Sequence, residues 1–413
     1  MKHCRKWLAL GGALVLVAVV GCTRSPKDDS GKLVWAIGGA EAQPGGVHQA
    51  VAELWNKQNP DTPIRIEILP EDADSQREQQ ALELQAGSSG FDVLGVDVIW
   101  TGEYAENGWV ESLEDVRSQI EPMSLPGPFK SATWGGKLWA APYNSNAGFL
   151  YYRTDLVDSP PTTWEEMCAI GTTIGKAKGI AGFVGQGARY EGFVVNWLEY
   201  YWSGGGEIYN ENQSKVMFDV ALANRATQFM ADARDTCYAA GFNTAREEEA
   251  RHEFQAGKAV FMRNWPYAYA LIKADVDSPV RGDFAIAPLP TFTGQGTISA
   301  LGGFNNAVSV FSNHTDLAKK FVVWAATDPG PQGLLAKRGT PPTMAAAYDK
   351  FQDDPVMALL GKVLAEARPR PPAPAWNEIS VKMQHTLFDA YNGRADIQSA
   401  SEDIRAYLEG TID

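Results

Sequence analysis

Hydrophobic and polar positions follow two different periods after the N-terminal segment. Leu33–Ile37 is a short apolar run that ends at two glycines, a pattern typical of a buried strand. Apolar residues at 47, 51, 54 and 55 share one face of a helix. Further along, alternating isoleucines at 64–68 predict a second strand, helix formers fill 76–86, and 91–98 is apolar like a third strand. This β-α-β-α-β order predicts an α/β fold with a parallel sheet covered by helices.

Carboxylates follow the carboxyl ends of these predicted strands, at the edge of an open parallel sheet where ligands collect. Glu41, Glu71–Asp72 and Asp97 all lie there. Asp97 is the most informative, because an unpaired carboxylate within an apolar strand end is costly. We interpret Asp97 as a ligand-binding residue; the alternative is that it caps the next helix through backbone N–H groups.

Strands and helices are predicted through the rest of the chain. Residues 137–142 and 148–152 predict two strands, and we expect the chain to cross between lobes at the polar stretch 143–146 that separates them. Residues 192–202 predict an aromatic helix whose rings pack in the core. About the last 40 residues are mostly helical in pattern.

The N-terminal segment has the pattern of a secretion signal. Basic residues at 2, 5 and 6 precede an apolar run at 8–20, which is shorter than the roughly 20 residues that a membrane-spanning helix needs. Residues 1–21 are therefore predicted to be a signal peptide. The small residue before Cys22 resembles the lipobox of bacterial lipoproteins, in which this cysteine is lipidated, and 22–31 would be a polar tether. The alternative is an ordinary signal peptide followed by a coincidental cysteine. We expect the protein at the extracellular face of the cell membrane, in contact with the membrane only through this lipid.

Composition narrows the classes of function. The 413 residues are 45% hydrophobic and 21% charged, which fits a large globular protein of two lobes. A formal charge of −14 disfavours nucleic acid as a partner. Five histidines give little material for a metal centre, and the sequence has no nucleophile elbow, zinc-protease motif or phosphate-binding loop. We therefore expect neither an enzyme nor a cofactor. A surface glycosidase that uses a pair of carboxylates is the enzymatic alternative.

Two cysteines remain if Cys4 is removed with the signal peptide and Cys22 is lipidated. An oxidising location outside the cell permits a disulfide between Cys168 and Cys237, which would close a long loop. The alternative is a pair of buried free thiols.

Short motifs along nearly the whole chain after residue 32 resemble one family. They are Trp35–Ala40, Gln76–Arg77, Val96–Trp100, Gly136–Pro142, Leu150–Arg153, Tyr190–Gly192, Arg263–Tyr267, Ala287–Pro290, Leu301–Gly303 and Arg368–Pro371. In these motifs the chain resembles the extracellular solute-binding proteins of ABC importers (family 1), in the cluster of the maltose-binding protein and closest to its trehalose- and maltose-binding lipoproteins. The resemblance implies a two-lobed fold of the type II periplasmic-binding-protein class, with interwoven crossovers and a helical C-terminal tail.

The resemblance also implies the limits of the lobes and the residues of the site. The N-terminal lobe would comprise 32–141 and 291–342, and the C-terminal lobe 142–290 and 343–413. The implied substrate-binding residues are Glu41, Gln76, Arg77, Asp97, Asn144, Asn146, Tyr190, Glu191, Trp265, Gly303, Phe304 and Arg370. They imply a monomer that binds an α-linked disaccharide, trehalose or maltose-like, between the lobes and interacts with the permease subunits of an ABC transporter.

These residue types suit a sugar. Carboxylate, amide and guanidinium groups can bind adjacent hydroxyls, and an aromatic ring can cover the apolar face of the sugar. Tyr190 and Glu191 are expected at the rim. For Trp265 the alternative is packing between lobes, and for Arg370 it is a solvated charge on a loop. Phe304 stands where archaeal relatives have tryptophan, which bears on the identity of the sugar more than on its class. Another neutral solute, such as a glucosylglycerol, or a glycerophosphodiester is the alternative ligand.

Overall fold

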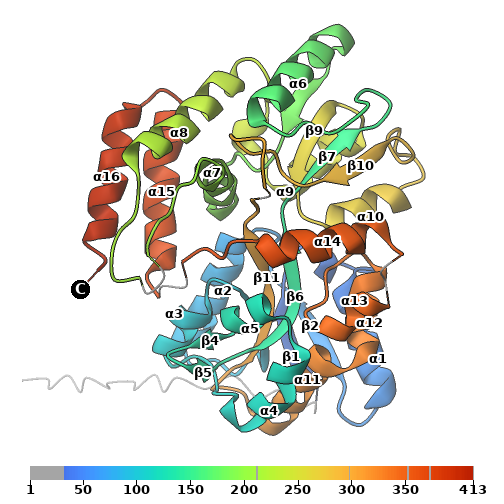
Figure 1. Cartoon of the computed structure of the whole chain (residues 1–413). Helices are drawn as coiled ribbons and strands as arrows, with labels where there is room; N and C mark the ends of the chain where they lie inside the picture. The colour runs from blue at the N-terminus through green and yellow to red at the C-terminus, as the bar shows by residue number, and fades with distance from the viewer. Residues whose placement is uncertain (1–31, 211–212, 297, 351–352, 372–373, 413) are drawn as a thin grey trace, which may run out of the picture.

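The computed structural model describes residues 32–210, 213–296, 298–350, 353–371 and 374–412. The predicted signal peptide, the predicted lipidation site at Cys22 and the predicted tether lie outside these residues. Within the described ranges, no helix is long and apolar enough to cross a membrane. The fold consists of two α/β lobes, each built on its own sheet (Figure 1).

The first sheet contains the three strands that the N-terminal pattern predicts. Its order is β2 (Ile64–Ile68), β1 (Leu33–Ile37), β3 (Val93–Asp97), β11 (Leu301–Val308) and β6 (Ala141–Ala147). β1 pairs in parallel with both β2 and β3, so the predicted parallel arrangement is confirmed. β11 is antiparallel to both of its neighbours, and it joins β3 to a strand that lies far from it in the sequence.

Helices cover this first sheet because β1 is apolar along its whole length, β3 is apolar up to Asp97, and both strands are buried on both faces. The helices of this lobe are α1 (Val47–Gln58), α2 (Ala73–Gln85), α3 (Thr101–Glu106), α4 (Arg117–Ile120), α5 (Pro126–Ser131), α11 (Thr315–Thr327), α12 (Pro329–Lys337) and α13 (Ala345–Asp349), with a short hairpin of β4 (Thr133–Trp134) and β5 (Lys137–Leu138). α2 begins before the predicted residue 76, because the Asp72 carboxylate accepts a hydrogen bond from the Ser75 N–H at 3.0 Å and caps the helix there.

The second sheet has the order β10 (Phe284–Ala287), β7 (Phe149–Arg153), β9 (Ala259–Asn264) and β8 (Ala181–Val184). Its lobe also contains α6 (Trp164–Lys178), α7 (Glu191–Ser203), α8 (Val220–Arg234), α9 (Glu247–Gln255), α10 (Tyr267–Ala274), α15 (Trp376–Tyr391) and α16 (Ile397–Glu409). Every residue of α7 is buried, so the predicted aromatic core helix is confirmed. The predicted helical C-terminal tail is also confirmed, since α15 and α16 pack with α7 and α8 on one side of this lobe (Figure 1).

Three segments connect the lobes. β6 leads into β7 through Gly148, β10 leads into β11, and the segment after α14 (Pro355–Glu366) leads into α15. The second and third segments lie side by side, since Ala300 and Arg368 form a parallel bridge. The expectation that the polar stretch 143–146 is a break between strands is wrong: these residues lie inside β6, and the break is at Gly148.

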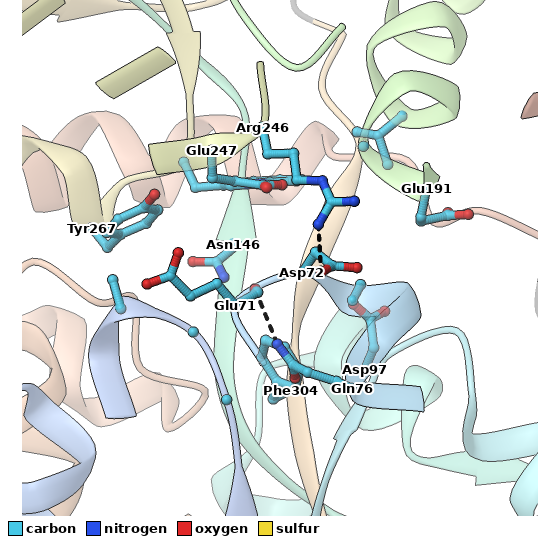
Figure 2. Close-up of a pocket in the computed structure, with 18 of the residues that line it drawn as sticks. Glu71, Asp72, Gln76, Asp97, Asn146, Glu191, Arg246, Glu247, Tyr267 and Phe304 are labelled. Atoms are coloured by element: carbon cyan, nitrogen blue, oxygen red, sulfur yellow. Dashed lines mark hydrogen bonds and ion pairs between the residues drawn. The ribbon is translucent and has the colours of Figure 1, made fainter. Parts of the chain in front are cut away.

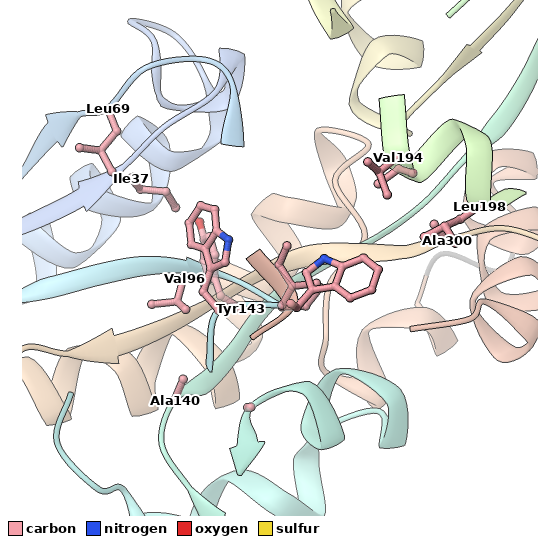
Figure 3. Packing of buried hydrophobic residues seen from close by; sticks show 14 of the residues in the cluster. Ile37, Leu69, Val96, Ala140, Tyr143, Val194, Leu198 and Ala300 are labelled. Carbon is pink, nitrogen blue, oxygen red and sulfur yellow. The ribbon is translucent and has the colours of Figure 1, made fainter. Parts of the chain in front are cut away.

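Buried apolar side chains fill both lobes and the region between them (Figure 3). Ile37 and Val96 belong to β1 and β3 of the first sheet, and Val194 and Leu198 belong to α7 of the other lobe. Because the core is continuous beside the connecting segments, the side chains that surround them are closely packed.

Cys168 and Cys237 are free cysteines that lie next to each other. A hydrogen bond with Cys237 and burial together raise the pKa of the Cys168 thiol far above its ordinary value. A disulfide between them therefore stays a prediction.

Candidate functional site

A cavity of about 190 Å³ lies between the two sheets, at the carboxyl ends of β1, β2 and β3. Figure 2 shows side chains from both lobes pointing into it. Ten of the twelve expected site residues line it, namely Glu41, Gln76, Asp97, Asn146, Tyr190, Glu191, Trp265, Gly303, Phe304 and Arg370. The structure thus brings together residues that lie up to several hundred positions apart in the sequence.

The wall contributed by the first lobe, which we call the N wall, depends on glycines. A Cβ at Gly38 would lie 2.5 Å from the carbonyl oxygen of Pro70 and from the side chain of Gln76, so only glycine allows β1 and α2 to approach this closely. Gly303 has a φ of +120°, and a Cβ there would overlap the carbonyl oxygen of Asn144. The backbone at both places therefore forms the surface of the cavity.

Asp97 ends β3 and faces the cavity with Arg370. Its Oδ1 accepts a hydrogen bond from Arg370 Nη2 at 3.2 Å and one from the Ile99 N–H at 3.1 Å. The alternative role, a cap of the next helix, is wrong: α3 has no side-chain cap, and the Ile99 N–H that Asp97 binds lies before that helix. Burial raises the pKa of the Asp97 carboxyl above its ordinary value, while the Arg370 charge lowers it.

Arg370 connects the two walls of the cavity. Its Nη1 donates to Glu191 Oε1 at 2.6 Å, and Glu191 belongs to α7 of the other lobe. Arg370 is 4% exposed, so the alternative of a solvated loop charge is wrong. Tyr190 and Glu191 are also buried, which means that the expectation of two residues at the rim is wrong as well.

Three residues of the lining each have a buried side-chain atom that has no hydrogen-bond partner among the described residues. These atoms are Arg370 Nε, Gln76 Oε1 and Asn146 Oδ1. A buried polar atom left unpaired costs about 1–3 kcal/mol. One donor and two acceptors therefore remain for a polar ligand.

Aromatic rings form the apolar part of the lining. Trp265 and Tyr267 follow β9 in the second lobe, and Phe304 lies on β11 in the first. The Trp265 ring packs close to Gly302, where a Cβ would lie 3.2 Å from it. Packing between lobes, which we considered as the alternative for Trp265, is thus present in addition to its position on the cavity.

The start of α9 contributes residues that the sequence analysis missed. Arg246, Glu247, Glu248 and Glu249 all line the cavity. Arg246 Nη1 donates to Asp72 Oδ2 at 2.6 Å and so joins the two lobes (Figure 2). The signal in the sequence is a run of three acids in the first turn of a helix. Helix N-termini favour acids for electrostatic reasons alone, so this signal does not distinguish a binding site.

Arg77 and Asn144 are the two expected site residues that do not line the cavity. The Arg77 guanidinium forms a two-bonded ion pair with Glu103 on α3, with Nε and Oε2 2.8 Å apart. Asn144 Oδ1 accepts a hydrogen bond from the Phe304 N–H at 3.1 Å. Asn144 therefore supports the strand that carries Phe304.

Several carboxyl groups in and beside the cavity have raised pKa values because they are buried. Burial raises the pKa of Glu41 from 4.5 to about 7, and a hydrogen bond from Thr340 opposes this shift. Burial and the charge of Glu191 raise the pKa of Asp74 from 3.8 to about 7. Burial also raises the pKa of Glu247, which accepts a hydrogen bond from the Tyr190 hydroxyl at 2.7 Å. Eight carboxylate residues and two arginines line the cavity, so its lining is strongly acidic.

Several polar groups of the site are already bonded to one another. The Glu191 carboxylate is already bonded to Arg370, Trp376 and Ser380. In the part of the chain that the structure describes, no group of three or more His, Cys, Asp or Glu residues is placed to hold a metal ion. The arrangement is suited to holding a polar ligand by several weak contacts.

Comparisons with known proteins agree with this arrangement. Residues 39–330 match the family described as bacterial extracellular solute-binding protein. A probable ABC transporter-binding protein of Deinococcus radiodurans is 32% identical over 337 residues, which is 78% of this chain and 79% of that protein. The structure of maltose-bound MalE3 of T. maritima superimposes with a TM-score of 0.85 at 34% identity, over 92% of this chain and 99% of that one. A solute-binding protein from Thermotoga lettingae bound to α-D-tagatose, at 21% identity and a TM-score of 0.84, shares the fold over 92% of this chain and the whole of that one.

Proposed function

Because this chain belongs to the family of bacterial extracellular solute-binding proteins, we propose that it binds an α-linked disaccharide, trehalose or maltose, between its lobes and delivers it to the permease of an ABC transporter. At the coarser level, the chain is a sugar-binding protein of an ABC transporter, located outside the cytoplasm and related to proteins that are not enzymes. We further propose that lipidation of Cys22 keeps it at the outer face of the membrane.

One observation supports a sugar most directly. The unpaired Arg370 Nε, Gln76 Oε1 and Asn146 Oδ1 belong to a cavity that also presents the rings of Trp265 and Phe304. A sugar hydroxyl both donates and accepts, so a few hydroxyls can satisfy all three atoms while the C–H face of the sugar covers a ring. MalE3, whose structure contains maltose, is 34% identical to this chain.

The charge of the lining disfavours the alternative of a glycerophosphodiester. Its two arginines are both paired with carboxylates of the lining, Arg246 with Asp72 and Arg370 with Asp97 and Glu191. An anionic ligand would lie beside further acidic residues that pair with neither arginine, such as Glu247. A neutral solute such as a glucosylglycerol remains compatible with the same groups.

Isothermal titration with trehalose, maltose, sucrose, cellobiose and glucose tests the proposal. We expect trehalose or maltose to bind at least tenfold more tightly than the β-linked cellobiose. Release of glucose from any of these sugars would instead support a glycosidase. The absence of heat with every sugar would contradict the proposed function.

Closure of the lobes around the sugar is part of the proposal, because Asp97 and Glu191 come from different lobes and both contact Arg370. A ligand held by both lobes stabilises the closed state. Small-angle scattering should show a smaller radius of gyration with saturating sugar than without it. An unchanged radius would count against closure.

A further inference from the structure

A buried ion pair lies directly beneath the cavity, between α7 and β9. Arg263 Nε donates to Glu199 Oε2 at 2.8 Å and Arg263 Nη2 donates to Glu199 Oε1 at 2.6 Å, and both side chains are 1% exposed. A buried ion pair is weak evidence for stability, because the desolvation of two charges offsets most of their attraction. The presence of the Arg263–Glu199 pair therefore needs an explanation other than stability, and the contacts that the pair makes supply one.

The first of these contacts is with Trp265. The Arg263 guanidinium carbon lies 4.0 Å from the centroid of the Trp265 ring, close enough for a cation–π interaction. The backbone of Trp265 is fixed as well, since its N–H donates to Asn264 Oδ1 at 2.8 Å and its carbonyl accepts from the Tyr151 hydroxyl at 2.6 Å. The guanidinium is thus one of the surfaces on which the ring rests.

The second contact is with the segments that connect the lobes. Glu199 Oε1 also accepts the Ala300 N–H at 3.1 Å, on the segment that leads into β11. A Cβ at Gly148 would lie 2.5 Å from Arg263 Nη2 and 2.7 Å from Glu199 Oε1, so the break between β6 and β7 packs directly on the pair. Ser299 Oγ joins the two segments, since it accepts from the Gly148 N–H at 2.5 Å and donates to the Gly148 carbonyl at 3.2 Å.

We propose that Arg263 and Glu199 are positioning residues that hold the Trp265 ring at the cavity and link its position to the two connecting segments at Gly148 and Ala300. A ligand that packs on the ring then also acts on the segments about which the lobes move. This inference rests on the proposed function, since it assigns the ring a ligand in the cavity.

The test replaces the pair by apolar residues in the double variant Arg263→Met/Glu199→Leu. Such a replacement keeps the interior filled and is often neutral for stability, whereas removal of one charge is not. We expect a modest loss of thermal stability, because the Ala300 N–H loses its acceptor. We also expect a loss of affinity for the preferred sugar of about threefold, which does not exceed the effect of removing the ring, and a smaller change in radius of gyration on sugar binding. Arg153→Met, which removes an arginine–aspartate pair from the same sheet, is the control and should leave affinity unchanged.

A double-mutant cycle with Trp265→Phe separates positioning from a general structural effect. If the pair acts through the ring, the loss of affinity caused by Arg263→Met/Glu199→Leu is smaller in the Trp265→Phe background than in the wild type. Equal losses in both backgrounds, or no loss in either, would overturn the inference. Should the double variant fail to fold, Arg263→Lys takes its place with the same expectation, because it keeps a positive charge beside Glu199 but removes the planar guanidinium from the ring.

A measurement without sugar keeps this inference separate from the proposed function. The difference in iodide quenching of fluorescence between proteins with Trp265 and with Trp265→Phe reports the exposure of this one ring. We expect that difference to grow when the pair is replaced. If it does not change, the inference is wrong even where sugars bind; if it grows and no sugar binds to the wild type, only the proposed function fails.

Discussion

The two walls of the cavity are built in different ways. The N wall consists of strand ends and tight glycines, with Asp97 fixed by the backbone of Ile99. The wall of the second lobe, which we call the C wall, consists of helix starts and the segment after β9, and it carries Trp265, Tyr267 and three consecutive glutamates. The N wall therefore provides fixed polar groups and one ring, Phe304, while the C wall provides most of the rings. Each wall carries four carboxylate residues. Arg370 belongs to a connecting segment and contacts carboxylates of both walls.

The largest effect is expected for Arg370→Ala, which removes the side chain that bonds to both walls, to Asp97 and to Glu191. The substitution leaves Asp97 and Glu191 buried beside each other without their shared cation, and removal of one partner of a buried pair costs about 3–5 kcal/mol. We expect sugar affinity to fall at least a hundredfold and the protein to be less stable in thermal unfolding. Arg405→Ala on α16, which breaks an exposed pair, is the control. Affinity within threefold of the wild type would show that the walls act independently.

Glu41→Gln should reveal the cost of an ionised carboxyl on the N wall. The pKa of Glu41 is about 7 in the folded protein, above its ordinary value of 4.5, so the folded state holds a proton that the unfolded state has lost between these values. Stability therefore falls as pH rises from about 4.5 to 7 and is level above that. The variant should be more stable than the wild type at pH 8, by on the order of 2 kcal/mol after allowance for partial exposure, and equal to it at pH 4. Urea unfolding at the two pH values measures this difference, and a gain of the same size at both would contradict it.

Asp97→Ala should weaken sugar binding at least tenfold, because a hydrogen bond to a charged group contributes about 1.5–3 kcal/mol. The loss should appear mainly as a less favourable enthalpy in titration calorimetry. Asp92→Asn, one residue before the start of the same strand, is the control for a change of charge. An unchanged sugar affinity of Asp97→Ala would show that Asp97 does not bind the sugar. It would also contradict the proposal that the N wall provides the polar contacts.

Trp265→Ala should have the smallest effect of the four, an affinity loss of about three- to tenfold, since an aromatic contact contributes about 0.5–1.5 kcal/mol beyond the area that it buries. Its signature should differ from that of Asp97→Ala. The heat-capacity change on binding should become less negative, because less apolar surface is buried. The two variants together test whether the N wall contributes mainly polar contacts and the C wall mainly apolar contacts. The same changes in binding enthalpy and heat capacity for both variants would contradict this difference between the walls.

The difference between the walls also explains how far the sequence could predict the site. The strands of the N wall follow one another along the chain, and parallel strands bring their carboxyl ends together, so the hydrophobic pattern alone could place Glu41 and Asp97 at one edge. The pairing of β11 with β3 could not be predicted, because the two strands lie about two hundred residues apart in the sequence. The hydrophobic pattern of a buried strand does not indicate which strand it pairs with. On the C wall, Arg246 and the glutamates after it have an ordinary explanation as the start of a helix. Only the family resemblance could bring Trp265 and Arg370 to the site.

The position of β11 has a consequence for how the chain acquires its structure. Residues 301–308 fill the gap between two strands that emerge from synthesis much earlier, so the first sheet cannot close until most of the chain exists. α15 and α16 complete the second lobe later still. Pairings between such distant residues make folding slow, because a long loop must close before they form. A chain that gains its tertiary structure only near its end stays extended for longest during synthesis, which is the condition that export across a membrane in unfolded form requires.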